Sequence, residues 1–199
     1  MKEIKKKLKI NSTVWPLKKD TLNSWAYWNS AFTSEECDKI IKIGNKNILT
    51  KASIFKGTDT KTRDSSISWI YPNKDVNWIF ERITDIIVNL NKDYFKFDLY
   101  GFIEGLQFTH YKSPGGKYTK HVDEGAAFVR KLSLSIQLSD SDSYKGGDLL
   151  LHLEETPVIL PREKGKLIAF PSYSLHEVKS VTKGERYSLV AWITGPRFK

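Results

Sequence analysis

The sequence predicts a mainly β protein of the α+β class, with a double-stranded β-helix core (a jelly roll, cupin-like) and N-terminal helices packed outside it. Apolar residues recur at helical spacing only before residue 91, and beyond it they alternate with polar residues with a period of two. Several such strands follow one another without intervening helices, which is typical of antiparallel barrels. Apolar residues make up 40% and aromatic residues 13% of the chain, enough for a packed globular core.

The length of 199 residues suits one domain, which should bury ~70% of the surface of the unfolded chain. Cys37 is the only cysteine, so no intrachain disulfide can form, and the lysine-rich start has no apolar signal-peptide segment. No apolar run approaches the ~18 residues that a membrane span needs. We therefore expect a cytoplasmic protein without a membrane partner, and the sequence leaves both a monomer and a homodimer open.

The positive charge is concentrated near the N-terminus. The net charge is +9, and residues 1–20 contain seven lysines against Glu3 and Asp20. We expect a basic N-terminal arm over residues 1–27 and a folded domain over residues 28–199. The arm could bind an acidic surface such as nucleic acid, or it could be a solvated terminus. The second interpretation is favoured, so no specific nucleic-acid partner is expected.

Two amphipathic helices are predicted in the first half of the chain. The first begins at Thr33-Ser34-Glu35-Glu36, where a capping side chain precedes acidic residues. Its apolar face consists of Cys37, Ile40, Ile41 and Gly44. Cys37 is therefore interpreted as a small core residue and not as a redox centre. The second helix begins near Asp75, and its apolar stripe should pack on a sheet: Val76, Ile79, Phe80, Ile83, Ile87 and Leu90.

The second half of the chain is predicted to form strands. They are expected over residues 97–111, 131–139, 148–153, 165–170, 173–178 and 186–194. In the second of these, leucine and isoleucine alternate with polar residues between Lys131 and Leu138, which indicates a strand with one buried face. Between the two helices, residues 50–72 mix strand-like pieces with polar turns.

A candidate metal site lies in the β half. His121 and Asp123 are two residues apart on an extended segment, so their side chains point to the same face of the backbone. His176 from a distant strand would complete a 2-His-1-carboxylate triad, which holds Fe(II) and leaves positions open for a cosubstrate and dioxygen. A bidentate acid such as 2-oxoglutarate also needs a buried cation for its far carboxylate. Arg186 is expected to supply that cation.

This ordered set, His121-x-Asp123, then His176, then Arg186 ten residues further on, resembles the Fe(II)/2-oxoglutarate-dependent oxygenases of the prolyl 4-hydroxylase type, including PKHD-type hydroxylases. The similarity runs from about residue 28 to about residue 195. The resemblance implies an oxidoreductase that uses Fe(II), 2-oxoglutarate and O2 to hydroxylate a C–H bond, with a prolyl residue in a peptide or protein as the favoured substrate.

The resemblance also assigns residues around the metal. It implies that Tyr111 and Ser188 bind the cosubstrate with Arg186, although Tyr111 is equally well interpreted as a core tyrosine. Arg130 and Trp192 match positions that contact the peptide, with a surface cation and a core aromatic as the alternatives. Finally, the segment that contains Arg63, Ser65 and Trp69 resembles a substrate-side lid loop, or is an ordinary surface loop.

Other functions stay open at this point. An oxygenase acting on a free amino acid or another small molecule is one, because Thr194 stands where some peptide-binding members have histidine. A nucleic-acid demethylase is another, but it would be expected to have a further arginine soon after Arg186, and residues 187–196 contain none. The alternative from a different class is a non-catalytic β-barrel binding module.

Overall fold

The computed structural model describes residues 23–47, 49–52, 59–123, 125 and 128–198. The lysine-rich residues 1–20, on which the prediction of a basic arm depends, lie outside these ranges. Strand β1 (Ala26–Trp28) crosses the boundary expected between residues 27 and 28, because it already pairs with the large sheet.

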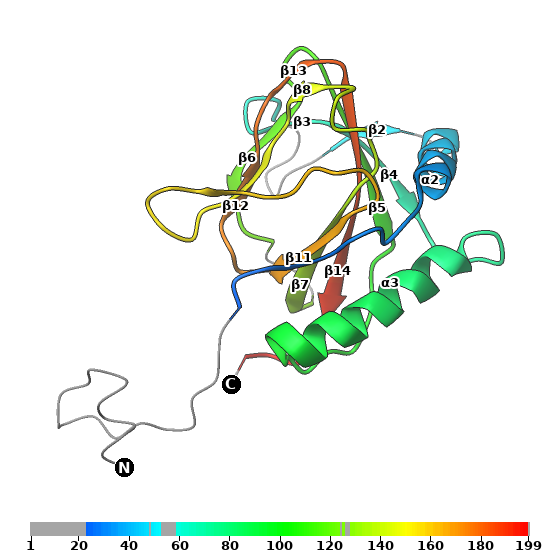
Figure 1. The fold of residues 1–199 in the computed structure, drawn as a ribbon, viewed down its shortest axis with the longest axis vertical. Helices are drawn as coiled ribbons and strands as arrows, with labels where there is room; N and C mark the ends of the chain where they lie inside the picture. Colours follow the sequence, from blue (N-terminus) through cyan, green and yellow to red (C-terminus); the bar gives the residue numbers. More distant parts are fainter. Residues whose placement is uncertain (1–22, 48, 53–58, 124, 126–127, 199) are drawn as a thin grey trace.

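Two antiparallel sheets form the body of the protein, as the predicted jelly roll requires (Figure 1). The larger has the strand order β1-β11-β7-β14-β5-β4-β2 and the smaller the order β10-β9-β12-β6-β3. The other strands of the large sheet are β2 (Thr50–Lys51), β4 (Ser66–Ile70), β5 (Leu106–Lys112), β7 (Arg130–Gln137), β11 (Leu167–Pro171) and β14 (Glu185–Thr194). Those of the small sheet are β3 (Arg63–Asp64), β6 (Lys117–His121), β9 (Leu149–Leu151), β10 (Val158–Ile159) and β12 (His176–Val178). A separate ribbon pairs β8 (Lys145–Gly146) with β13 (Val181–Lys183).

Both predicted helices are present and lie outside the barrel, on the same side of the large sheet (Figure 1). Helix α2 (Ser34–Lys46) begins with a capping box, in which Thr33 and Glu36 each accept a hydrogen bond from the backbone N–H of the other. Helix α3 (Asn77–Leu90) continues into a π-helical turn (Asn91–Phe95). Among the described residues, no helix is both long enough and apolar enough to cross a membrane.

Cys37 lies on the buried face of α2 and is fully inaccessible to solvent. Burial raises the pKa of its thiol to about 11, so the reactive thiolate is disfavoured at neutral pH. Its interpretation as a core residue agrees with this environment.

The large sheet is buried on both faces. On one face, alternate residues of β7 and β14 pack against the helices in the main hydrophobic core, among them Leu134, Ile136 and Leu189. On the other face, a second core fills the space toward the small sheet and includes Leu151, Phe170 and other apolar side chains. Because side chains alternate along a strand, each strand of this sheet contributes to two different environments.

Three predictions of local structure are wrong. Strand β7 has no solvent-exposed face, because Ser133, Ser135 and Gln137 are as buried as the residues between them and point into the space between the sheets. The strand expected from residue 97 begins only at Leu106, since the preceding stretch forms a single bridge between Gly101 and Thr194. The segment expected as a lid loop is built into both sheets instead.

In that segment, Arg63 belongs to β3, which pairs with β6, and Trp69 belongs to β4, which pairs with β5. Side chains alternate along β4: Ile67 and Trp69 lie on the cavity wall, whereas Ser68 and Ile70 face the helices, where the hydroxyl of Ser68 donates to the carbonyl of Gly44. The side chains that resembled a lid are therefore fixed on strands. Residues 53–58 of the same segment lie outside the described ranges.

Candidate active site

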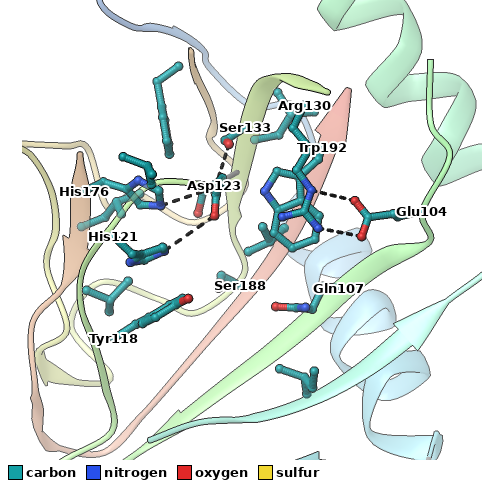
Figure 2. Close-up of a pocket in the computed structure, with 18 of the residues that line it drawn as sticks. Glu104, Gln107, Tyr118, His121, Asp123, Arg130, Ser133, His176, Ser188 and Trp192 are labelled. Atoms are coloured by element: carbon teal, nitrogen blue, oxygen red, sulfur yellow. Dashed lines mark hydrogen bonds and ion pairs between the residues drawn. The ribbon is translucent and has the colours of Figure 1, made fainter. Parts of the chain in front are cut away.

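A cavity of about 620 Å³ opens between the two sheets (Figure 2). Strands of both sheets contribute to its wall, and the polar face of β7 forms part of it. The structure brings together on this wall all nine residues that the sequence suggested for a site: Arg63, Tyr111, His121, Asp123, Arg130, His176, Arg186, Ser188 and Trp192.

The three predicted metal ligands converge in this cavity. Strands β6 and β12 are neighbours, and their register places His176 opposite His121. Asp123 follows β6, where its backbone N–H donates to the carbonyl of Ser172 at 2.9 Å. Its carboxylate lies between the imidazoles, with Oδ1 3.7 Å from Nε2 of His121 and Oδ2 3.5 Å from Nε2 of His176 (Figure 2). One possible ligand atom from each residue lies within 4.8 Å of the other two.

The hydrogen bonds of the imidazoles fit a metal site. Nδ1 of His121 lies 2.7 Å from the carbonyl of Thr119, and Nδ1 of His176 lies 2.9 Å from the carbonyl of Ser174. A carbonyl only accepts, so both Nδ1 atoms must carry the proton and both Nε2 atoms keep a lone pair directed at Asp123. Burial and the neighbouring His176 lower the pKa of His121 to about 4, which keeps this ring neutral. Two neutral imidazoles and one carboxylate are the donor set that Fe(II) takes in a facial triad.

Asp123 is held as a carboxylate and in a fixed orientation. Burial acts to raise its pKa, but the adjacent His176 and His121 and the hydroxyl of Ser133 keep the pKa below its usual value. Ser133 donates to Oδ2 at 2.7 Å, and its hydroxyl also lies 3.0 Å from that of Ser172. Ser133 therefore orients the ligand from behind, in the way that outer hydrogen bonds position metal ligands.

Arg186 supplies a buried positive charge to the same cavity. It lies on β14 and is only 2% exposed. Nη2 donates to Oε1 of Gln137 at 3.0 Å, and Nη1 lies 3.5 Å from the hydroxyl of Ser188. Among the described residues, no carboxylate lies within ion-pair distance of this guanidinium. A buried cation without a counter-ion is costly, so the arrangement suits an anionic ligand such as the far carboxylate of 2-oxoglutarate.

The surroundings of Arg186 keep it in place. Its guanidinium lies 5.3 Å from the ring centre of Tyr111. Gly147, in the Gly-Gly pair before β9, has a positive φ of 69°, and a Cβ atom there would come within 3.1 Å of Cδ of Arg186. Glycine is therefore required by both the backbone conformation and the close approach.

Arg130 and Trp192 form a different arrangement on the wall. Arg130 makes two hydrogen bonds to Glu104, from Nε at 2.7 Å and from Nη2 at 2.6 Å, and its guanidinium lies 3.8 Å from the centre of the Trp192 ring (Figure 2). Arg130 is thus paired with an acidic residue on the cavity wall and is not the surface cation given above as the alternative. Trp192 is buried, and its indole interacts with the carboxylate of Asp123 as one of the groups that lower the pKa of Asp123.

Arg63 approaches the metal site from the other wall. Its guanidinium lies 4.5 Å from the centre of the Tyr118 ring, and that ring stacks on His121 with 3.4 Å between centroids. Nη2 of Arg63 donates to Oε1 of Gln107 at 2.8 Å, and Nε donates to the hydroxyl of Ser65 at 3.1 Å. Arg63, Tyr118 and His121 therefore form a continuous stack.

Several polar residues of the cavity were not predicted from the sequence. They are Glu104, Gln107, Tyr118, Ser133, Ser135 and Gln137. The alternation of polar and apolar residues could have indicated those that lie on strands. On β5, β7 and β14 the polar residues occupy alternate positions, and these positions face the interior of the barrel. The remaining histidines, His110 and His152, lie off the cavity beside Glu185 and Glu177, as locally paired side chains.

Residues 106–194 match the family model described as the 2OG-Fe(II) oxygenase superfamily. These residues, a little under half of the chain, are similar to that superfamily. This range contains the three candidate ligands and Arg186. The superfamily implies Fe(II), 2-oxoglutarate and O2, which agrees with the donor set and the buried cation described above.

Curated proteins similar to this chain are named PKHD-type hydroxylases. One from Rippkaea orientalis is 40% identical over 96 residues, which are 46% of this chain and 43% of that protein. One from Prochlorococcus marinus strain MIT 9215 is 31% identical over 156 residues, which are 75% of this chain and 64% of that protein. The chain thus spans less than two thirds of the length of either relative.

Solved structures show the same fold. A prolyl hydroxylase from Trichoplax adhaerens, in complex with a peptide fragment of the hypoxia inducible factor oxygen degradation domain, superposes with a TM-score of 0.74 at 18% identity, covering 87% of this chain and 84% of that one. A prolyl-4-hydroxylase from Pseudomonas putida superposes with a TM-score of 0.69 at 18% identity, covering 87% and 94%. The predicted jelly-roll fold is confirmed.

Proposed function

We propose that this protein is an Fe(II)- and 2-oxoglutarate-dependent dioxygenase that hydroxylates a prolyl residue in a peptide or protein. One observation carries the proposal: the same cavity holds two Nε2 lone pairs converging on Asp123 and, on another strand, the buried guanidinium of Arg186 without a carboxylate partner among the described residues. Neither feature stabilises the protein alone, since one gathers lone pairs around a buried carboxylate and the other buries a positive charge without a counter-ion among the described residues.

The residues of the cavity have separate roles in this proposal. Bound Fe(II) and 2-oxoglutarate supply the oxidation, in which loss of CO2 from the cosubstrate accompanies insertion of one oxygen atom into a C–H bond. His121, Asp123 and His176 hold the metal, and Ser133 keeps the carboxylate in position. On β14, Arg186 and Ser188 bind the far carboxylate of 2-oxoglutarate, with Tyr111 beside them. Apolar side chains such as Leu149 and Phe170 line the wall and limit the entry of water.

The prolyl assignment is supported by the shape and chemistry of the wall. The indole of Trp192 offers a flat surface suited to a proline ring. Proline also fixes φ, so a peptide that contains it costs less entropy to hold extended across the mouth. Relatives with hydroxylase names and a structural neighbour bound to a peptide point in the same direction.

The test is reconstitution under argon with Fe(II) and 2-oxoglutarate, followed by oxygen and measurement of succinate with panels of peptides, nucleotides and free amino acids. We expect succinate formation to rise with proline-containing peptides, and mass spectrometry to locate one added oxygen on proline. The Asp123→Ala protein is the control. Stoichiometric succinate with a free amino acid, and none with peptides, would replace the peptide by a small-molecule substrate. Absence of succinate under all conditions would favour a non-catalytic binding module.

A further inference from the structure

We propose that the substrate carries a carboxylate close to the oxidised carbon, and that Arg63 binds it. The inference rests on the proposed function, since it concerns the substrate of the same site. It follows from the charges of the cavity, the fixed position of Arg63 and the contrast between Arg63 and Arg130.

The charges of the cavity leave one cation without a partner. Among the described residues, the charged side chains that line it are those of three arginines (Arg63, Arg130 and Arg186) and two acidic residues (Glu104 and Asp123). Fe(II) adds two positive charges and 2-oxoglutarate two negative ones, so the loaded cavity keeps the same excess of one positive charge. Arg130 is paired with Glu104, and Arg186 is assigned to 2-oxoglutarate. The excess charge is therefore located at Arg63.

Arg63 is built as a receptor for an anion. Its two described hydrogen bonds go to neutral acceptors, the Gln107 carbonyl and the Ser65 hydroxyl, and no described carboxylate lies within ion-pair distance. Nη1 donates to no described residue, although a guanidinium has five N–H groups in all. The side chain is half-buried and lies on the face of Tyr118, which fixes its plane. A fixed guanidinium with free N–H groups binds a carboxylate with little loss of entropy.

The position of Arg63 limits where the carboxylate can be in the substrate. Only the ring of Tyr118 separates the guanidinium from the imidazole of His121. The two distances place the guanidinium carbon at most about 8 Å from the centre of the imidazole, so an anion at Arg63 lies within one residue's reach of a substrate carbon held beside that imidazole. This spacing suits an α-carboxylate of the oxidised residue itself or an acidic side chain directly beside it, and it excludes an acid many residues away.

Arg130 is the internal comparison for this inference. It lies on the opposite wall of the same cavity, and Glu104 neutralises it through two hydrogen bonds along one edge of the guanidinium. A substrate carboxylate at Arg130 would have to displace Glu104 or sit beside a second negative charge. Arg63 presents neither obstacle, so a carboxylate is expected on the Tyr118 side of the mouth and not on the Trp192 side.

The experiment compares acid and amide forms of otherwise identical probes. The pairs are L-proline with L-prolinamide, Ala-Pro with Ala-Pro-amide, blocked Ala-Pro-Glu-Ala with blocked Ala-Pro-Gln-Ala, and the acid and amide forms of the other amino acids. Binding to the protein loaded with Fe(II) and 2-oxoglutarate is measured under argon by calorimetry, and turnover is measured separately as succinate. The first two pairs test an α-carboxylate, and the third tests an acidic neighbour.

The parent should bind at least one acid roughly ten- to hundredfold more tightly than its amide, as expected for a hydrogen-bonded charge pair. Arg63→Gln should abolish this preference, Arg63→Lys should retain part of it, and Arg63→Glu should reverse it toward amides. Lys61→Gln removes a charge from an exposed side chain two residues away and should leave the preference unchanged. Affinity for 2-oxoglutarate should stay the same in all four variants.

Equal binding of every acid and its amide by the parent, or an undiminished preference in Arg63→Gln, would overturn the inference. The binding comparison reports on Arg63 whether or not turnover follows. Absence of succinate with intact binding selectivity would count against the proposed oxygenase function alone.

Discussion

The two faces of the large sheet are built from the same strands and serve different purposes. On β7, Leu134 and Ile136 pack against the helices, whereas Ser133, Ser135 and Gln137 face the cavity. Strand β14 repeats the arrangement, with Leu189 and Ala191 toward the helices and Arg186, Ser188 and Trp192 toward the cavity. Neighbouring residues thus belong alternately to the hydrophobic core and to the site.

This difference separates stability from function along one chain segment. The helix-facing residues bury apolar surface, which stabilises the fold. The cavity-facing residues bury polar groups whose hydrogen bonds are only partly satisfied within the protein, which costs stability until ligands bind. Substitutions on the helix-facing side should therefore lower stability with little effect on ligand affinity. Substitutions on the cavity-facing side should lower ligand affinity with little effect on stability.

The largest effect is expected at the metal ligands. Asp123→Ala or His176→Ala removes one of three protein ligands, so Fe(II) binding and turnover should be lost. The fold should survive, because the removed groups line a cavity and are not packed in the main core. Calorimetry with Fe(II) under argon and the melting temperature of the metal-free protein measure the two effects.

His110→Gln is the matched control. His110 lies on β5 outside the cavity, so this substitution should leave the Fe(II) affinity unchanged. In the parent, Fe(II) should raise the melting temperature by ligand linkage, and a chelator should reverse the rise. Normal Fe(II) binding by His176→Ala would exclude this residue as a ligand.

Arg186→Ala is expected to have the next largest effect. Loss of one partner from a buried charge pair costs about 2–5 kcal/mol, so the KM for 2-oxoglutarate should rise roughly 30-fold to several-thousand-fold. Fe(II) affinity should change little, since Arg186 contacts no metal ligand through its described hydrogen bonds. Arg186→Lys should recover part of the loss. An unchanged KM in Arg186→Ala would place the anchor for 2-oxoglutarate elsewhere.

The alternation itself shows how far sequence reasoning reaches. Three features could be predicted from the sequence: the spacing from His121 to Arg186, the helix start at Thr33 and the apolar stripe of α3. Each depends on local periodicity or on an ordered set of residues. The polar face of β7 was misassigned to solvent. Polar and apolar residues alternate along a strand whether its polar face is buried or exposed to solvent. Only the position of β7 between the two sheets shows that its polar face is buried.

Pairings between distant segments were also out of reach. The salt bridge from Glu104 to Arg130 and the hydrogen bond from Arg63 to Gln107 join residues 26 and 44 positions apart. Neither spacing follows from a helix or a strand. The lid loop was misjudged for a related reason, because β3 and β4 each derive their order from a partner strand that is remote in the sequence.

Ile136→Ala tests the helix-facing side. Ile136 is fully buried between Ser135 and Gln137, and truncation of a core isoleucine costs about 2–5 kcal/mol of the free energy of unfolding. Denaturant unfolding measures this loss. At a temperature where the variant is folded, its KM for 2-oxoglutarate should match that of the parent, whereas the adjacent Gln137→Ala should raise that KM with a smaller loss of stability. A raised KM in Ile136→Ala without a change in stability would contradict the separation of the two faces.

The smallest effect is expected at Ser133, which lies on the cavity face but touches the metal only through Asp123. Ser133→Ala removes the hydrogen bond to Oδ2 and leaves the three ligands in place. Removal of such outer partners typically lowers metal affinity about 10- to 100-fold, so Fe(II) should bind that much more weakly. Ser133→Thr keeps the hydroxyl and should restore the affinity, while the KM for 2-oxoglutarate at saturating Fe(II) should stay constant in both variants. If Ser133→Ala bound Fe(II) like the parent, Asp123 would be oriented by the backbone around Ser172 alone, and the polar face of β7 would contribute to the site only through Gln137.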